Sequence, residues 1–161
     1  MKVKSIFDRY KIQVEGDTIY DPIREKWLHL TPEEAVRQKT IRFLMKRLGV
    51  PKHKIVVERS LASFGVKGSR KRIDIGVLDD EDLIMAVVEC KASLTRNDEA
   101  AFQQAQDYLL NLNTRYYFVT DGDEFSGFYY DTVQFIKLEE IPKYDRWYYY
   151  RRNDGFILRA T

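Results

Sequence analysis

The sequence predicts a mixed α/β fold, in which a central mixed β-sheet is flanked by helices. Three observations support this fold class. A helix with a clear start is followed by three segments rich in β-branched residues, and a second helical pattern precedes three more short strands. Because a helix bridges the two sets of strands, we expect one sheet with helices against its faces. The length of 161 residues suits a single domain.

The first elements follow from local signals. Residues 1–30 mix short alternations with Gly and Pro and predict an N-terminal extension that is irregular or forms short strands. A helix then begins in "LTPEEAVRQKTIRFLMKRLGV". Thr31 fits the N-cap, Pro32 fits the first helical position, and Glu34 completes a capping box. A core domain is therefore expected over residues 31–142.

The rest of the core domain alternates strands with one helix. We predict a strand over 54–65, a basic loop in "VKGSRK", and a hairpin in "RIDIGVLDDEDLIMAVVECKA" that turns near "DDED". The segment "SLTRNDEAAFQQAQDYLLNLN" predicts a helix, and "RYYFVT", "FSGFYY" and "TVQFIKL" predict strands. Pro142 ends the expected core and leaves a Tyr- and Arg-rich segment at 143–161.

Composition limits the classes of function. The net charge of +2 is nearly balanced, so any basic surface must come from local clustering. The single Cys90 excludes an internal disulfide and suits a reducing compartment; a buried thiol is usually inert. No signal-peptide core and no apolar run of transmembrane length is found. We therefore expect a cytoplasmic protein with no membrane partner.

Three charges on the predicted hairpin indicate a possible chemical site. Asp74 interrupts its first apolar strand, and Glu89 and Lys91 close the second. Burying a charge is costly unless it is paired or holds a metal. If Glu81 and Asp82 form the loop, Asp74 lies directly opposite Glu89, and a loop shifted by one residue pair leaves them diagonal on one face. Two carboxylates this close repel each other unless a cation lies between them.

A hard divalent ion would serve as that cation. Mg²⁺ takes oxygen ligands and keeps several waters, so Asp74 and Glu89 could hold it. The ion would polarise a phosphoryl oxygen and lower the pKa of a water, while Lys91 could orient that water or stabilise the developing charge. This chemistry fits phosphodiester hydrolysis. A plain cross-strand ion pair between Asp74 and Lys91 explains the same residues without a metal.

The motifs "LTPEEAVRQ", "VVERSL", "RIDI", "VVECKA" and "QQAQDYLLNL…YYFVTDG" occur in this order over about residues 18–145. With them the sequence resembles the PD-(D/E)XK nuclease superfamily, and in particular the N-terminal nuclease domain family of type I restriction enzyme R proteins. The resemblance implies a restriction-endonuclease-like fold, Mg²⁺- or Mn²⁺-dependent cleavage and DNA as the partner. It leaves open a role for other subunits of a restriction complex, or a homodimer.

The resemblance also implies roles for single residues. Asp74 and Glu89 would bind metal, Lys91 would be the catalytic lysine, and Glu34 would be the helix acid that joins the metal site. Gln104 and Tyr108 match a Q-x-x-x-Y pattern of several nuclease families in this superfamily. Their spacing of four puts them on one helix face, where they would join the catalytic site by orienting the lysine or contacting the nucleic acid. The capping box explains Glu34 without a metal, and Gln104 and Tyr108 could equally be ordinary surface and half-buried side chains.

The sequence departs from the pattern of the nuclease family at two points, and it contains one basic loop that could bind nucleic acid. Ile73 replaces the nominal proline before the aspartate, and no G-x-x-x-x-G-K-[ST] element of an ATP-driven motor is present in the sequence. Just before Asp74, a basic loop is placed to grip a phosphate backbone, although solvated turn charge is the alternative; its cations are Lys67, Arg70, Lys71 and Arg72.

Three functions therefore stay open. The first is a metal-dependent nuclease domain, and the second is a nucleic-acid-binding module that kept the fold but cuts poorly or only within a complex. The third is a scaffold that docks a partner through its Tyr-rich end. There, "YDRWYYYRR" could stack bases and pair phosphates, or form an edge strand or a subunit contact.

Overall fold

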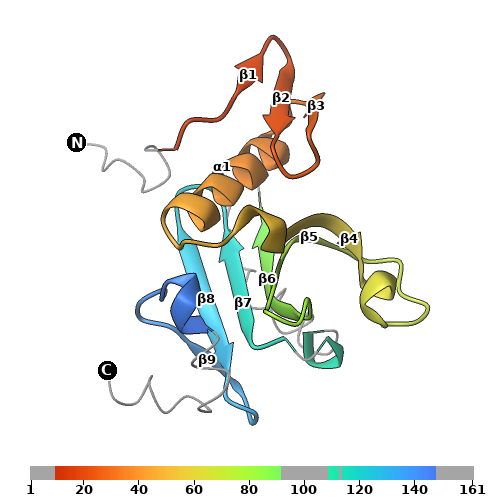
Figure 1. Cartoon of the computed structure of the whole chain (residues 1–161), viewed down its shortest axis with the longest axis vertical. Coiled ribbons are helices and arrows are strands. Elements are labelled where there is room, and N and C mark those ends of the chain that lie inside the picture. The colour runs from red at the N-terminus through yellow and green to blue at the C-terminus, as the bar shows by residue number, and fades with distance from the viewer. Residues whose placement is uncertain (1–9, 92–108, 113, 148–161) are drawn as a thin grey trace.

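The structure is a computed structural model, and it describes residues 10–91, 109–112 and 114–147. A small three-stranded sheet precedes one long helix, and a six-stranded sheet follows (Figure 1). The elements are β1 (Val14–Glu15), β2 (Thr18–Asp21), β3 (Lys26–His29), α1 (Pro32–Lys46), η2 (Lys52–Lys54), β4 (Ile55–Ser60), η3 (Leu61–Phe64), β5 (Arg72–Leu78), β6 (Ile84–Cys90), β7 (Tyr116–Thr120), β8 (Phe125–Tyr130) and β9 (Phe135–Lys137).

The large sheet has the strand order β4-β5-β6-β7-β8-β9. Among the strands that the structure describes, β6 and β7 run parallel, and the other neighbours in this sheet are antiparallel. The predicted mixed α/β fold is thus confirmed. Residues 109–111 are helical. Most of the second helix predicted between β6 and β7 lies outside the described residues.

Helix α1 begins where the sequence predicts. The Thr31 hydroxyl accepts a hydrogen bond from the Glu34 backbone N–H at 3.1 Å, and Pro32 opens the helix. Among the described residues, the Glu34 carboxylate does not accept a hydrogen bond from the Thr31 backbone N–H, as a capping box requires. It accepts hydrogen bonds from the guanidinium groups of Arg24 and Arg37 instead. Half of the predicted capping box is therefore replaced by ion pairs that tie α1 to its surroundings.

The strand predicted over 54–65 is shorter in the structure. β4 ends at Ser60, whose side chain accepts a hydrogen bond from the Ser63 backbone N–H and caps the 3-10 helix η3. Gly65 ends η3 with a φ of 95°, a conformation that glycine adopts without steric cost. The strand therefore ends at this side-chain cap, although the residues that follow favour strand structure.

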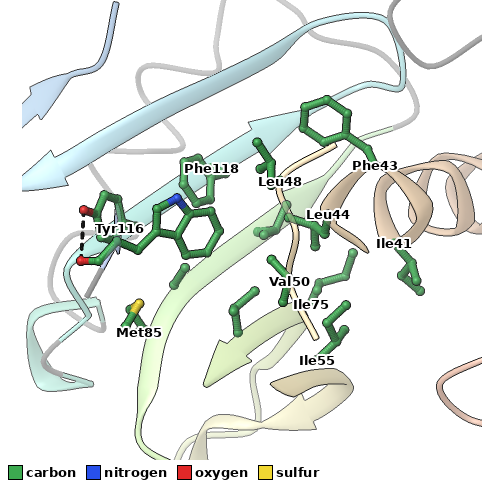
Figure 2. Close-up of a cluster of buried hydrophobic side chains, with 14 of the residues drawn as sticks. Ile41, Phe43, Leu44, Leu48, Val50, Ile55, Ile75, Met85, Tyr116 and Phe118 are labelled. Carbon is green, nitrogen blue, oxygen red and sulfur yellow. Dashed lines mark hydrogen bonds between the residues drawn. The ribbon is translucent and has the colours of Figure 1, made fainter. Parts of the chain in front are cut away.

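Two apolar clusters form the core. The larger cluster joins α1 to the sheet, with Ile41, Leu44, Ile75, Tyr116 and Phe118 among its members, as Figure 2 shows. The smaller cluster contains side chains of the opposite alternation on the same strands, such as Val87 and Tyr117. Because the side chains on both faces of the sheet are buried, the strand sequences are nearly continuous apolar runs. They do not alternate between apolar and polar residues.

The core continues past Pro142, where the sequence analysis ended it. Residues 144–147 form a helical turn, and Trp147 is fully buried in the larger cluster. Its indole N–H donates to the Pro142 carbonyl at 2.7 Å, and the Tyr116 hydroxyl donates to the Trp147 carbonyl at 3.3 Å. The first part of the Tyr- and Arg-rich segment thus packs against β7. Residues 148–161 lie outside the described residues.

The small sheet contains a buried acid whose charge state should show in acid unfolding. Asp21 is fully buried and accepts hydrogen bonds from the backbone N–H groups of Ile23 and Arg24, at 2.7 and 3.0 Å, and from the Arg24 side chain. Burial alone would raise the pKa of Asp21, but these hydrogen bonds and the Arg24 charge lower it below its ordinary value. A lowered folded-state pKa means that this contribution to stability is present above the unfolded-state pKa of about 3.9.

We therefore expect Asp21→Asn to cost about 1–2 kcal/mol of unfolding free energy at pH 7, because the charge on the acceptor is lost. The cost should vanish as the pH falls through the folded-state pKa, where the wild-type carboxyl is protonated as well. Urea unfolding of both proteins across pH 2–7 measures this. A cost that stayed constant over the whole range would contradict it.

Candidate functional site

The hairpin places its two acids as neighbours. Beyond a β-bulge at Val77 and Leu78, Ile75 pairs with Val88, and the same register continued by one residue sets Asp74 opposite Glu89. The turn itself is built on Asp79, whose carboxylate accepts backbone hydrogen bonds from Glu81 and Leu83 at 2.9 and 3.0 Å. The sequence predicts this facing position from a two-residue loop of Glu81 and Asp82. The turn between Asp79 and Leu83 is one residue longer, and the bulge restores the predicted register.

The Asp74 carboxylate lies between the two strands. Its Oδ2 atom accepts the Cys90 backbone N–H at 2.9 Å, where a backbone carbonyl would sit in an unbroken ladder. Ile73 and Ile75 are two residues apart, yet they pack in different core clusters, so the alternation of β5 is interrupted at Asp74. The interruption directs this carboxylate along the sheet, toward the backbone that carries Glu89.

Arg37 of α1 is the centre of a charge network that sequence reasoning missed. Its guanidinium donates to Glu34, to Glu58 Oε1 at 2.5 Å and to Asp74 Oδ1 at 3.1 Å. Glu33 adds a longer ion pair at 3.8 Å. Arg37 is buried, and its Nε atom has no hydrogen-bond partner within the part of the chain that the structure describes. The guanidinium therefore sits among carboxylates from one helix and two strands.

Charge and burial act on Arg37 in opposite directions. Burial alone would lower the pKa of Arg37, but the carboxylates of Glu34, Asp74 and Glu58 outweigh it, and the pKa is raised. The guanidinium stays charged, so it neutralises part of the acid cluster. The charge that the sequence places inside the hairpin at Asp74 is compensated, in this structure, by an arginine from α1.

Glu58 is the second residue that sequence reasoning missed. It lies opposite Asp74 across β4 and β5, between the pairs Val57–Ile75 and Arg59–Ile73. Its φ of 54° is unusual for a residue other than glycine, and strained backbone of this kind tends to cluster at functional sites. The only signal in the sequence was an acid interrupting the strand "IVVERS". Glu58, Asp74 and Glu89 thus occupy one row across three neighbouring strands.

Lys91 is the more exposed partner of Glu89 at the end of β6. The Lys91 ammonium lies 3.4 Å from Glu89 Oε2, and the Lys91 side chain is 40% exposed. Alternation along β6 puts both side chains on one face, as the sequence predicts. Lys91 is thus placed to reach a ligand in solvent while it stays next to the acid.

The basic loop leads directly into Asp74. Its cations Lys67, Arg70, Lys71 and Arg72 are exposed between η3 and the start of β5. The Arg72 guanidinium lies 3.9 Å from Glu58, so the loop is electrostatically connected to the acid row. Gln104 and Tyr108 lie outside the described residues. Burial raises the pKa of the Cys90 thiol far above its ordinary value, which keeps this side chain an inert core residue.

The described residues of this network supply the carboxylate oxygens that a hard cation takes as ligands. Among the described residues, five carboxylates share three guanidinium groups in this network, namely Asp21, Glu33, Glu34, Glu58 and Asp74 with Arg24, Arg37 and Arg72. The excess negative charge and the oxygen donors suit Mg²⁺ or Mn²⁺. In the described part of the chain, however, no three acid, His or Cys side chains converge to hold a metal as they stand. The Arg37 guanidinium lies among the carboxylates of Glu34, Glu58 and Asp74.

Together, the fold and the site define a mixed α/β domain with an acid row and a lysine at one end of its central sheet. Residues 32–142 match the family "Type I restriction enzyme R protein N terminus (HSDR_N)". The chain belongs to this family. The matched range contains α1 and the strands β4 to β9, and therefore all the residues of the network except Asp21 and Arg24.

One solved structure supports the family on the level of the fold. It is a fragment described as an HsdR subunit of a type I restriction enzyme from Vibrio vulnificus YJ016, with a TM-score of 0.51 and 25% sequence identity. The match covers 70% of this chain and 24% of that one, so it spans about a quarter of the length of the solved fragment. No curated protein matches the sequence. Within the described residues, no helix has the length and apolarity that crossing a membrane requires.

Proposed function

We propose that this domain hydrolyses phosphodiester bonds of DNA with the help of Mg²⁺ or Mn²⁺, as a nuclease domain of the type I restriction enzyme R class. The observation that carries the proposal is the row of Glu58, Asp74 and Glu89 on neighbouring strands, with Lys91 beside it, inside the range that matches this family. The DNA substrate and any partner subunits follow from the family alone.

Each residue has a role that its position supports. Asp74 and Glu89 would hold the divalent ion, which supplies Lewis acidity toward a phosphoryl oxygen when bound. Lys91 is partly exposed and positively charged, so it can stabilise the negative charge that develops on the phosphate. The exposed cations of the loop before β5 would hold the DNA backbone next to the acids.

A binding module that does not cut is the second candidate. Two observations favour it. Arg37 and Arg24 already pair with Asp74 and Glu34, and among the described residues no three acid side chains are arranged to hold a metal ion. In that case the basic loop would bind DNA, and the arginines would keep the acids neutralised. Other subunits would then be needed for cleavage.

Cleavage assays with the whole chain separate the two candidates. Duplex and single-stranded DNA are incubated with Mg²⁺, Mn²⁺ or EDTA, and we expect metal-dependent cutting that Lys91→Ala reduces by about 10²–10⁴-fold. Lys143→Ala, at an exposed lysine outside the site, serves as the control. Binding without cutting would support the second candidate. Cutting that persists in EDTA or in Lys91→Ala would exclude the proposed site.

A further inference from the structure

We propose that Arg37 is a positioning residue that holds the carboxylates of Asp74 and Glu58 together before a divalent ion arrives. This inference rests on the proposed function and deepens it, because it assigns a task to a side chain that does not itself touch the substrate. In the absence of metal, the guanidinium performs the neutralisation that would otherwise fall to the ion. It therefore keeps the site assembled and also competes with the ion.

The geometry supports the assembling role. From α1, the Arg37 Nη2 atom reaches Glu58 on β4 at 2.5 Å and Asp74 on β5 at 3.1 Å, while Nη1 reaches Glu34 on its own helix. One rigid, planar group thus fixes three carboxylates from three elements. The second contact of Asp74, from the Cys90 N–H, holds the same carboxylate on the β6 side. These two donors leave the Asp74 carboxylate little freedom to turn.

The competing role follows from charge. A divalent ion that binds Asp74 must share this carboxylate with the adjacent guanidinium, and the two positive charges repel each other. A carboxylate has about four lone-pair positions, so Asp74 can accept a metal in addition to its two hydrogen bonds. Arg37 should thus weaken metal binding and at the same time improve the geometry of the site that forms.

Glu58 sets the balance between these two effects. Its contact with Nη2 is shorter than that of Asp74, so it holds the guanidinium toward β4. Removing the charge of Glu58 would leave Asp74 as the main partner of Arg37 Nη2, while Nη1 stays paired with Glu34, and would also lower the negative charge of the row. Removing the charge of Arg37 would raise the net negative charge of the row and leave the Asp74 carboxylate free of a competing cation.

Two variants should therefore shift metal affinity in opposite directions. By titration calorimetry without DNA, Arg37→Met should bind Mn²⁺ about tenfold more tightly than the wild type, and Glu58→Gln about tenfold more weakly. Glu58 is partly exposed, so its variant is expected to fold even if Arg37→Met does not. Arg37→Lys keeps the charge without the fork and should bind Mn²⁺ nearly as the wild type does.

The cleavage rate at saturating Mn²⁺ gives the second readout. Arg37→Met should cut DNA at least tenfold more slowly despite its tighter metal binding, because Asp74 is no longer held, and Arg37→Lys should recover only part of the rate. A role limited to folding would not separate affinity from rate in this way. If Arg37→Met, folded and saturated with Mn²⁺, cuts as fast as the wild type, the positioning role is wrong.

The two proposals can fail separately. If the wild type cuts DNA but neither variant changes Mn²⁺ affinity, the inference about Arg37 fails and the nuclease proposal stands. If the opposite shifts in affinity occur but no protein cuts DNA, the nuclease proposal fails and Arg37 still controls the cation site. If Glu58→Gln binds Mn²⁺ more tightly, the opposite effects on metal affinity that we assign to Glu58 and Arg37 are wrong.

Discussion

Truncation of Trp147 to alanine is expected to lower the free energy of unfolding by about 4 kcal/mol. The indole is fully buried, stacks on Tyr116 at a centroid distance of 5.4 Å, and lies 5.2 Å from Phe118. Its N–H also donates to the Pro142 carbonyl. Removing it leaves a large cavity at the contact between the end of the described chain and the sheet. For a domain of this size, the unfolding midpoint should fall by roughly 10 °C.

The second tryptophan provides a matched control. Trp27 on β3 is 47% exposed and contacts Tyr20 at a centroid distance of 5.4 Å. The same change there, Trp27→Ala, should cost about 1 kcal/mol or less, because little cavity is created. Because the chain has two tryptophans, each variant also reports unfolding through the fluorescence of the other. Equal losses in the two variants would show that Trp147 is not a core residue.

Replacement of Arg37 by methionine is expected to cost about 3 kcal/mol of unfolding free energy in the absence of divalent ions. Methionine fills similar volume but leaves Glu34, Glu58 and Asp74 without the guanidinium. The value lies at the low end of the range for broken buried ion pairs, because Glu58 and Asp74 are partly exposed and water can reach them. Urea unfolding in EDTA measures the effect.

Two further variants test the cause of this loss. Arg47→Met, at an exposed arginine just after the same helix, should change stability by less than about 0.5 kcal/mol. Adding Asp74→Asn to Arg37→Met should recover part of the stability, since Asp74 has no other ion pair among the described residues and the asparagine amide oxygen can still accept the Cys90 N–H. If Arg37→Met costs no more than Arg47→Met, the network does not stabilise the fold.

The parts of the fold that could be predicted depend on signals within a few residues. Thr31 and Pro32 mark the start of α1 because capping is local, and the apolar runs around "DDED" mark the hairpin because the turn joins adjacent strands. The end of β4 was placed too late, because the cap at Ser60 and the left-handed Gly65 compete with strand propensity in a way that composition does not reveal. The packing of Trp147 needed tertiary contacts.

The candidate site divides in the same way. The register of Asp74 and Glu89 does not follow from turn length alone, because the turn between Asp79 and Leu83 is one residue longer than the predicted loop and the bulge at Val77 and Leu78 restores the register. That Glu89 and Lys91 share a face follows from their spacing. Arg37 could not be found by these rules. Arginine is common in helices, so Arg37 by itself gives no signal of a special role. Its partners on β4 and β5 are far away in the sequence. Glu58 was missed for the same reason, because its significance depends on the arginine it meets.

The three acids of the row lie on consecutive antiparallel strands, β4, β5 and β6, joined by short connections. Such a meander has low contact order, so its strands can pair early in folding, before the longer crossover to the parallel strand β7 closes. The acids would then meet while the sheet is still incomplete, and their mutual repulsion would oppose this step until α1 docks. Helix docking and the pairing of these strands are therefore expected to be one cooperative event, and low ionic strength should slow it.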